Sequence, residues 1–135
     1  MKLIKHWLVA GALLTTANLL TTANALAGEA ESAFTAELQQ CAAYYDLGAQ
    51  MVAAMNAPQM AAVGDRLKQQ GKQAAELAAK YDSNNAATIE KTKEQMMAST
   101  GGQGMGALMR QFKEPCQQLL SDPQARLNYW IMAKM

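Results

Sequence analysis

The feature that most constrains the fold is an apolar stripe whose members recur alternately every four and three residues between positions 31 and 56. This spacing places side chains on one face of an α-helix, where they form the seam of a helix pair. It predicts a long central helix from Glu31 to Asn56, and Gly48 in its interior allows a close helix crossing. The stripe comprises Phe34, Leu38, Cys41, Tyr45, Gly48, Val52 and Met55, and a second apolar set comprises Tyr44, Leu47, Met51 and Ala54.

Prolines and turn residues divide the rest of the chain into shorter helices. Pro58 suits the first turn of a helix, so a second helix is expected from Gln59 to Tyr81. The polar stretch 82–85 predicts a turn, and a third helix is expected from Ala86 to Ser99. Charged residues are expected on its solvent-facing side, namely Glu90, Lys91, Lys93 and Glu94.

The last third of the chain opens with a glycine-rich loop. Positions 100–106 hold four glycines, which favour a flexible connector over a helix. A short helix comes next, and Pro115 is expected to end it. Asp122 and Pro123 then predict the cap and first turn of a last helix near the C-terminus. Its inward side chains are expected to be Leu127, Trp130 and Ile131.

Composition and cysteines complete the fold prediction. Helix formers such as alanine, glutamine and methionine are abundant, and no segment alternates apolar and polar residues over a strand length. Cys41 and Cys116 are too far apart for a Cys-x-x-Cys redox pair, and we expect them to form a structural disulfide. Closing that loop stabilises the fold by about 4–5 kcal/mol in the chain-entropy description. The sequence predicts an all-α fold, a small antiparallel bundle of four to five helices with one disulfide.

The N-terminus has the layout of a cleavable signal peptide. Lys2 and Lys5 precede an uncharged apolar run, and Ala25-Leu26-Ala27 is a small-x-small cleavage pattern. A retained membrane anchor fits less well, because the apolar run is short and threonines and asparagines dilute the stretch after it. We therefore expect residues 1–27 to be removed, with cleavage after Ala25 as the alternative. Residues 28–135 are expected to form one helical domain, periplasmic or secreted, with no membrane anchor after cleavage.

Missing residue types disfavour several classes of function. The single histidine, His6, lies in the leader, so the mature chain has neither a histidine base nor a histidine metal ligand. With 10 basic and 11 acidic residues, the mature chain has no basic stripe for nucleic acid. The glycine-rich loop lacks the Lys-Ser/Thr of a phosphate-binding loop. Glu90 and Glu94 are interpreted as a solvated ion-pair face. We expect no enzymatic activity and no bound cofactor.

Methionine and aromatic residues are the one suggestive excess. Nine methionines lie after the leader, and thioethers suit both irregular cores and adaptable binding surfaces. The leading hypothesis is an exported protein-binding bundle, such as an inhibitor, immunity factor, adaptor or chaperone, whose partner is another exported or envelope protein. The contact surface suggested by the sequence comprises Tyr44, Met51, Met105, Met109, Tyr129 and Met132.

The same residues support two alternatives. A bundle can enclose a small apolar ligand between its helices, which would make the protein a carrier. Methionine sulfurs also bind Cu(I), but a copper site ranks third because it requires at least three sulfurs that converge. Apolar side chains exposed outside the helix seam favour a protein partner, whereas an enclosed cavity favours a ligand.

Overall fold

The computed structural model describes residues 15–101 and 103–135, with side chains from Gly28 onward. These residues form five α-helices and one 3-10 turn, and they contain no strand. The all-α bundle predicted from the sequence is therefore confirmed. The elements are α1 (Thr15–Ala54), η1 (Pro58–Met60), α2 (Ala61–Ala79), α3 (Asn85–Ser99), α4 (Met105–Ser121) and α5 (Pro123–Ala133).

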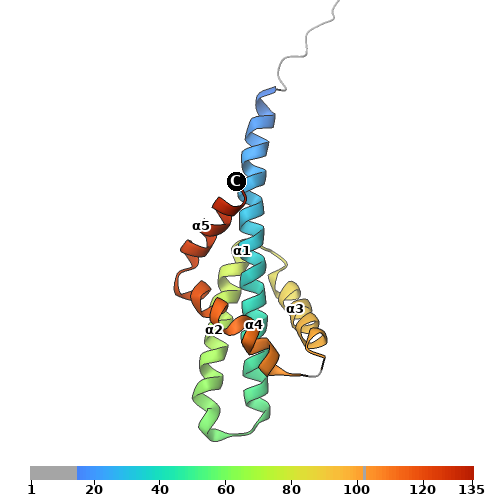
Figure 1. Cartoon of the computed structure of the whole chain (residues 1–135), viewed down its shortest axis with the longest axis vertical. Coiled ribbons are helices and arrows are strands. Elements are labelled where there is room, and N and C mark those ends of the chain that lie inside the picture. The colour runs from blue at the N-terminus through green and yellow to red at the C-terminus, as the bar shows by residue number, and fades with distance from the viewer. Residues whose placement is uncertain (1–14, 102) are drawn as a thin grey trace, which may run out of the picture.

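Helix α1 runs through the centre of the bundle, and the other helices pack around it (Figure 1). From Leu38 to Ala49, every residue except Gln40 and Asp46 is buried, so the prediction that this helix is central is confirmed. The helix begins at Thr15, earlier than the predicted start at Glu31. Its N-terminal half is rich in alanine and leucine and contains no proline that would break it.

Helices α1 and α2 form an antiparallel pair whose turn includes Asn56 (Figure 1). Asn56 has a φ of 51°, a left-handed conformation that asparagine tolerates and that ends a helix. Glycines allow the two helices to approach closely. A Cβ on Gly71 of α2 would lie 3.3 Å from the Cβ of Tyr45, and a Cβ on Gly48 of α1 would lie 3.3 Å from Leu67 Cδ1. The close crossing considered for Gly48 is present.

The prediction that Pro115 ends a helix is wrong, because α4 continues through it from Met105 to Ser121. Proline removes the hydrogen bond to the carbonyl four residues earlier, that of Gln111. Both Pro115 and Gln111 are exposed, so water can satisfy the freed carbonyl. Burial of Cys116 and Leu119 on the other side of the helix outweighs the cost of the proline. The sequence pattern alone does not show this balance.

A disulfide links Cys41 of α1 to Cys116 of α4, with their Cα atoms 5.5 Å apart. Both cysteines are buried in the core, beside Leu38 and Leu119. The bond joins residues separated by 75 positions. It therefore ties the central helix α1 to α4, as the cysteine content predicts.

Helix α5 is capped as predicted, since the Asp122 carboxylate accepts a hydrogen bond of 3.1 Å from the backbone N–H of Ala125. Leu127 and Trp130 pack against the core. The prediction that Ile131 faces inward is wrong, because its side chain is 42% exposed. Helix α5 lies over α1 on one side only, so it buries a narrower stripe than its run of large side chains suggests.

The predicted leader falls partly outside the described residues, which begin at position 15. Residues 15–27 form the N-terminal part of α1, which projects beyond the other helices (Figure 1). The C-terminal end of α5 lies beside α1 where this projection starts. There Lys134 lines a shallow hollow with Gly28 and Glu29. The packed body thus begins close to Gly28.

Candidate binding groove

A groove of about 470 Å³ runs between α2 and α4, and α1 forms its floor. Helices α2 and α4 each pack on α1 but have little contact with one another, which leaves the space between them open. Its lining is mainly apolar. The lining residues are Tyr44, Tyr45 and Gly48 of α1, Met60, Val63, Arg66, Leu67 and Gln70 of η1 and α2, and Met105, Met109, Lys113 and Gln117 of α4.

The glycine-rich connector sets where α4 enters this groove. Gly101 and Gly104 have φ angles of 57° and 72°, a left-handed backbone that glycine adopts without steric penalty. The chain turns there, and α4 begins at Met105. Met105 reaches the floor: a Cβ on Gly48 would lie 3.5 Å from its Cε. Gly48, which has no side chain, therefore leaves room for the flexible thioether of Met105 above it.

Three methionines, Met60, Met105 and Met109, line the groove from two sides. The same face of α1 continues past the groove floor to Met51 and Met55, which are exposed. Unbranched, polarisable thioethers adapt their shape to different apolar partners. The groove and the neighbouring face of α1 thus form a methionine-rich surface.

The charges on the groove rim are of one sign. Arg66 stands on the α2 side and Lys113 on the α4 side, and no lining residue is acidic. Both cations are exposed, and neither forms an ion pair with another described residue. The groove therefore combines an apolar interior with a positive rim, although residues 28–135 carry slightly more acidic than basic residues.

Tyr44 and Tyr45 form the deep end of the groove rather than an exposed surface. Tyr44 is only 4% exposed, so its assignment to a contact surface is corrected: it packs with its ring centroid 6.0 Å from that of Phe112. Burial raises the pKa of Tyr45 to about 12. The Tyr45 hydroxyl has no hydrogen-bond partner among the described residues. Both tyrosines are core residues that close the groove from below.

The structure brings only some of the other predicted contact residues together. Met105 and Met109 share the groove, and Met51 lies next to it on α1. Tyr129 and Met132 are 52% and 75% exposed, as expected of contact residues, but they lie on α5, apart from the groove.

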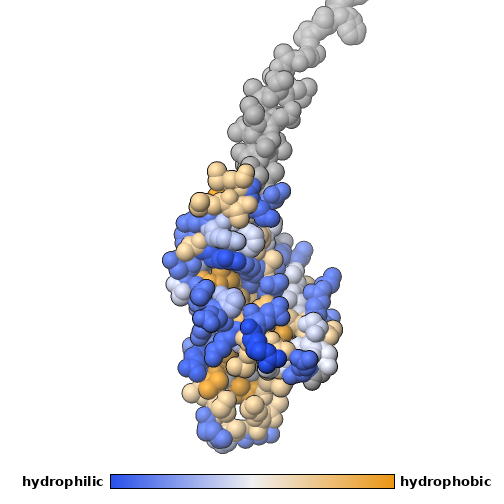
Figure 2. Space-filling model, viewed as in Figure 1, coloured by the Kyte–Doolittle hydropathy of each residue, from blue (hydrophilic) through white to orange (hydrophobic). Residues whose placement is uncertain are grey.

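The sequence pattern does not reveal the groove residues supplied by η1 and α2. Met60 fits the helical period of an apolar seam, and Arg66 that of a solvated face, so neither residue alone suggests a groove. Positions 47–64, at the α1–α2 turn, contain no charged residue. Figure 2 shows mainly apolar colours at that end of the molecule. An uncharged run that includes a turn is a sequence signal of an exposed apolar tip.

A second hollow, of about 490 Å³, lies between α1, α4 and α5. Its charged residues include Glu37, Asp122 and Arg126. Arg126 is already paired with Glu37, its Nε donating a hydrogen bond of 2.7 Å to Oε2. This hollow is more polar than the groove, and the only cationic side chain among its described lining residues, Arg126, is already in an ion pair with Glu37. The groove is therefore the better candidate for binding.

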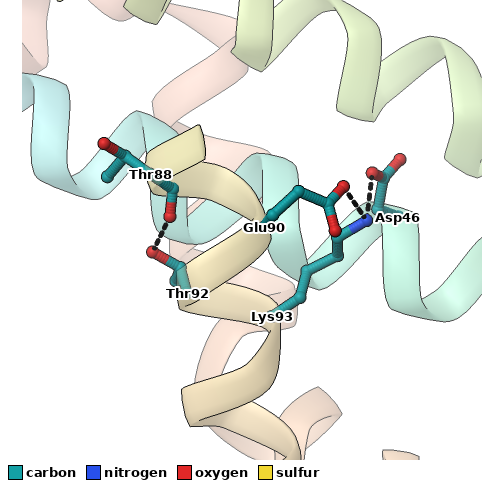
Figure 3. A network of polar contacts seen from close by, with 5 residues as sticks. All are labelled: Asp46, Thr88, Glu90, Thr92 and Lys93. Carbon is teal, nitrogen blue, oxygen red and sulfur yellow. Dashed lines mark hydrogen bonds and ion pairs between the residues drawn. The ribbon is translucent and has the colours of Figure 1, made fainter. Parts of the chain in front are cut away.

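An ion pair between a buried lysine and partly exposed carboxylates fixes α3 to α1 on another side of the molecule. Lys93 is only 9% exposed, which corrects its expected place on a solvated face. Its ammonium lies 3.2 Å from Asp46 of α1 and 2.7 Å from Glu90 (Figure 3). Burial alone would lower the pKa of Lys93, but the two carboxylates outweigh burial and hold that pKa above its ordinary value. We interpret this cluster as structural.

Ligand geometry and helix length among the described residues bear on metal and membrane roles. They contain no group of three or more His, Cys, Asp or Glu side chains placed to hold a metal ion. Three methionine side chains do line one groove, but Arg66 and Lys113 beside them disfavour a cation. Within residues 15–101 and 103–135, no helix combines the length and apolar character that crossing a bilayer requires.

Comparison of the chain with protein-family models, with curated proteins and with solved structures finds no match to any of them.

Proposed function

We propose that this chain is an exported, non-enzymatic binding protein that holds an apolar segment of another exported or envelope protein in the groove between α2 and α4. The observation that carries this proposal is the methionine-lined groove itself, with its positive rim. Exposed apolar surface of this kind marks interaction sites on soluble domains. Methionine suits a surface that must accept the side chains of a partner.

Export is supported by the leader and by the shape of the body. A positive start, an apolar run and a small-x-small pattern precede Gly28, and the packed body begins near that residue. Cleavage after Ala27 would place Glu29 and Glu31 in the first turn of α1, where the helix dipole favours acidic residues. The disulfide between Cys41 and Cys116 fits an oxidising compartment.

Photo-cross-linking tests the proposal at residue level. A benzophenone amino acid replaces Met109, on the groove, or Gln95, an exposed residue of α3 away from it. Each variant is expressed with its leader and irradiated in living cells. We expect discrete protein adducts from position 109 and none from position 95. Equal adduct patterns at both positions, or no protein adduct at position 109, would contradict the proposal.

A second candidate function, the carrier, is favoured by the volume of the groove. About 470 Å³ falls within the roughly 300–1,000 Å³ typical of small-molecule sites. An apolar molecule with a carboxylate would match the interior and the rim. Native mass spectrometry of the exported protein separates the two candidates, because a carrier retains a small passenger and a protein binder does not.

A further inference from the structure

We infer that the segment held in the groove is an amphipathic α-helix whose apolar stripe is flanked on both sides by acidic residues. This inference rests on the proposed function and names the chemistry of its partner. It depends on two observations: the described residues offer no strand edge to an extended segment, and Arg66 and Lys113 line the groove from different helices.

The backbone of the occupant decides its conformation. A peptide buried in an apolar groove must satisfy its own N–H and C=O groups, since each buried unpaired group is costly. An extended peptide cannot add to a sheet edge among the described residues, which contain no strand, and only side chains such as Gln70 and Gln117 remain to pair with its backbone. A helix satisfies these groups internally. The groove is bordered by α2 and α4 above α1, so one more helix could lay its apolar face across it.

The length of the groove sets how much of the occupant makes contact. Its α2 side runs from Met60 to Gln70, which corresponds to about 15 Å at 1.5 Å per residue. A partner helix would contact it over about three turns. Its apolar side chains would recur at i, i+3 or i+4, and i+7, and they would meet Met105 and Met109 on the opposite wall.

The rim charges determine which residues suit the flanks of that stripe. Arg66 and Lys113 are exposed, free of ion pairs with described residues, and carried by different helices. A helix lying between them presents one flank to each. Acidic residues on both flanks would gain charge-assisted hydrogen bonds, whereas basic flanks would be repelled on both sides.

Three synthetic helical peptides test this directly. All share one leucine and methionine stripe, and their flanking positions are all glutamate, all glutamine or all lysine. Binding to the exported, oxidised protein is measured by fluorescence anisotropy. We expect the glutamate peptide to bind on the order of tenfold more tightly than the lysine peptide, with the glutamine peptide between them. Added salt should reduce the difference.

Charge reversal supplies the matched control. The double variant Arg66→Glu/Lys113→Glu should prefer the lysine peptide, whereas Lys80→Glu/Lys91→Glu, which reverses two exposed cations outside the groove, should keep the original order. Equal affinity for all three peptides overturns the inference. Absence of binding by every peptide also overturns it, and if position 109 still cross-links to a protein, the proposed function stands. If position 109 gives no protein cross-link, the proposed function is contradicted as well.

Discussion

Arg126 of α5 donates two hydrogen bonds to the carboxylate of Glu37 on α1, 89 positions earlier in the chain. The same guanidinium lies 4.3 Å from the ring centroid of Tyr129. Helix α5 has no fully buried residue, so this ion pair and the packing of Leu127 and Trp130 hold it in place. The pair links the C-terminal helix to the central one.

This ion pair makes part of the stability depend on pH. Partial burial would raise the pKa of Glu37, but the Arg126 guanidinium outweighs burial and holds that pKa below its ordinary 4.5. A lowered carboxyl pKa contributes stability above pH 4.5, and this contribution is lost as the pH falls through the folded-state value.

Glu37→Gln should therefore lower the free energy of unfolding by about 1 kcal/mol near neutral pH. Urea denaturation across the acidic range should show the difference from wild type shrinking below pH 4.5. Glu31→Gln, a change at an exposed residue of the same helix, serves as the control and should show no such convergence. A constant difference down to about pH 3 would contradict the ion-pair account.

The helices were predictable because local pattern determines them, whereas their exceptions depend on tertiary neighbours. The alternating spacing around Leu38 and Tyr45 was sufficient to predict a central helix. Pro115 was misjudged because only the assembled bundle places it on the solvent side of α4. Lys93 was misjudged because its carboxylate partner Asp46 comes from another helix, 47 positions away. Sequence periodicity contains no information on such pairs.

The groove was predictable only in part for the same reason. Methionine content indicated Met105 and Met109, which share one helical face. Met60 joins them only because α2 and α4 flank α1 without touching each other closely. Tyr44 was placed on the surface because the sequence does not show that Phe112 covers it.

The disulfide should be a main source of stability. Cys41→Ser in oxidised protein should lower the melting temperature markedly, because opening a loop of 75 positions removes about 4–5 kcal/mol in the chain-entropy description. Differential scanning calorimetry measures this directly. Reduced wild-type protein should melt near the variant, and an unchanged melting temperature in the variant would rule out the disulfide.

The close crossing of α1 and α2 should not tolerate a larger residue at Gly71. Gly71→Ala places a Cβ 3.3 Å from that of Tyr45 and 3.6 Å from the Ala42 carbonyl, and overpacking should cost about 1–3 kcal/mol. Gly106→Ala in α4 is the matched control, because its Cβ meets nothing closer than 3.8 Å and alanine favours helix. In chemical denaturation, the free energy of unfolding should be higher than wild type for Gly106→Ala and lower than wild type for Gly71→Ala. The reverse order would show that the helices are further apart.

The ion pair that anchors α3 should matter more than surface charges. Lys93→Ala removes the ion pair to Asp46 and opens space beside α1; because the Asp46 side chain is 45% exposed and water can solvate it, we expect a loss of about 1–2 kcal/mol. Lys91→Ala, at an exposed position of the same helix, should change stability by less than about 0.5 kcal/mol. Similar effects of the two substitutions in thermal melts would indicate that α3 is not held by Lys93.

The most direct test of the central claim is a methyl-resolved NMR titration of methionine-labelled protein with the partner segment recovered from the cross-link at position 109. We expect the methyl signals of Met60, Met105 and Met109, which line the groove, to shift together on binding. Met97 and Met132, exposed elsewhere, should stay in place. Shifts confined to Met97 or Met132, with the groove methyls unchanged, would contradict the assignment of the groove as the binding site.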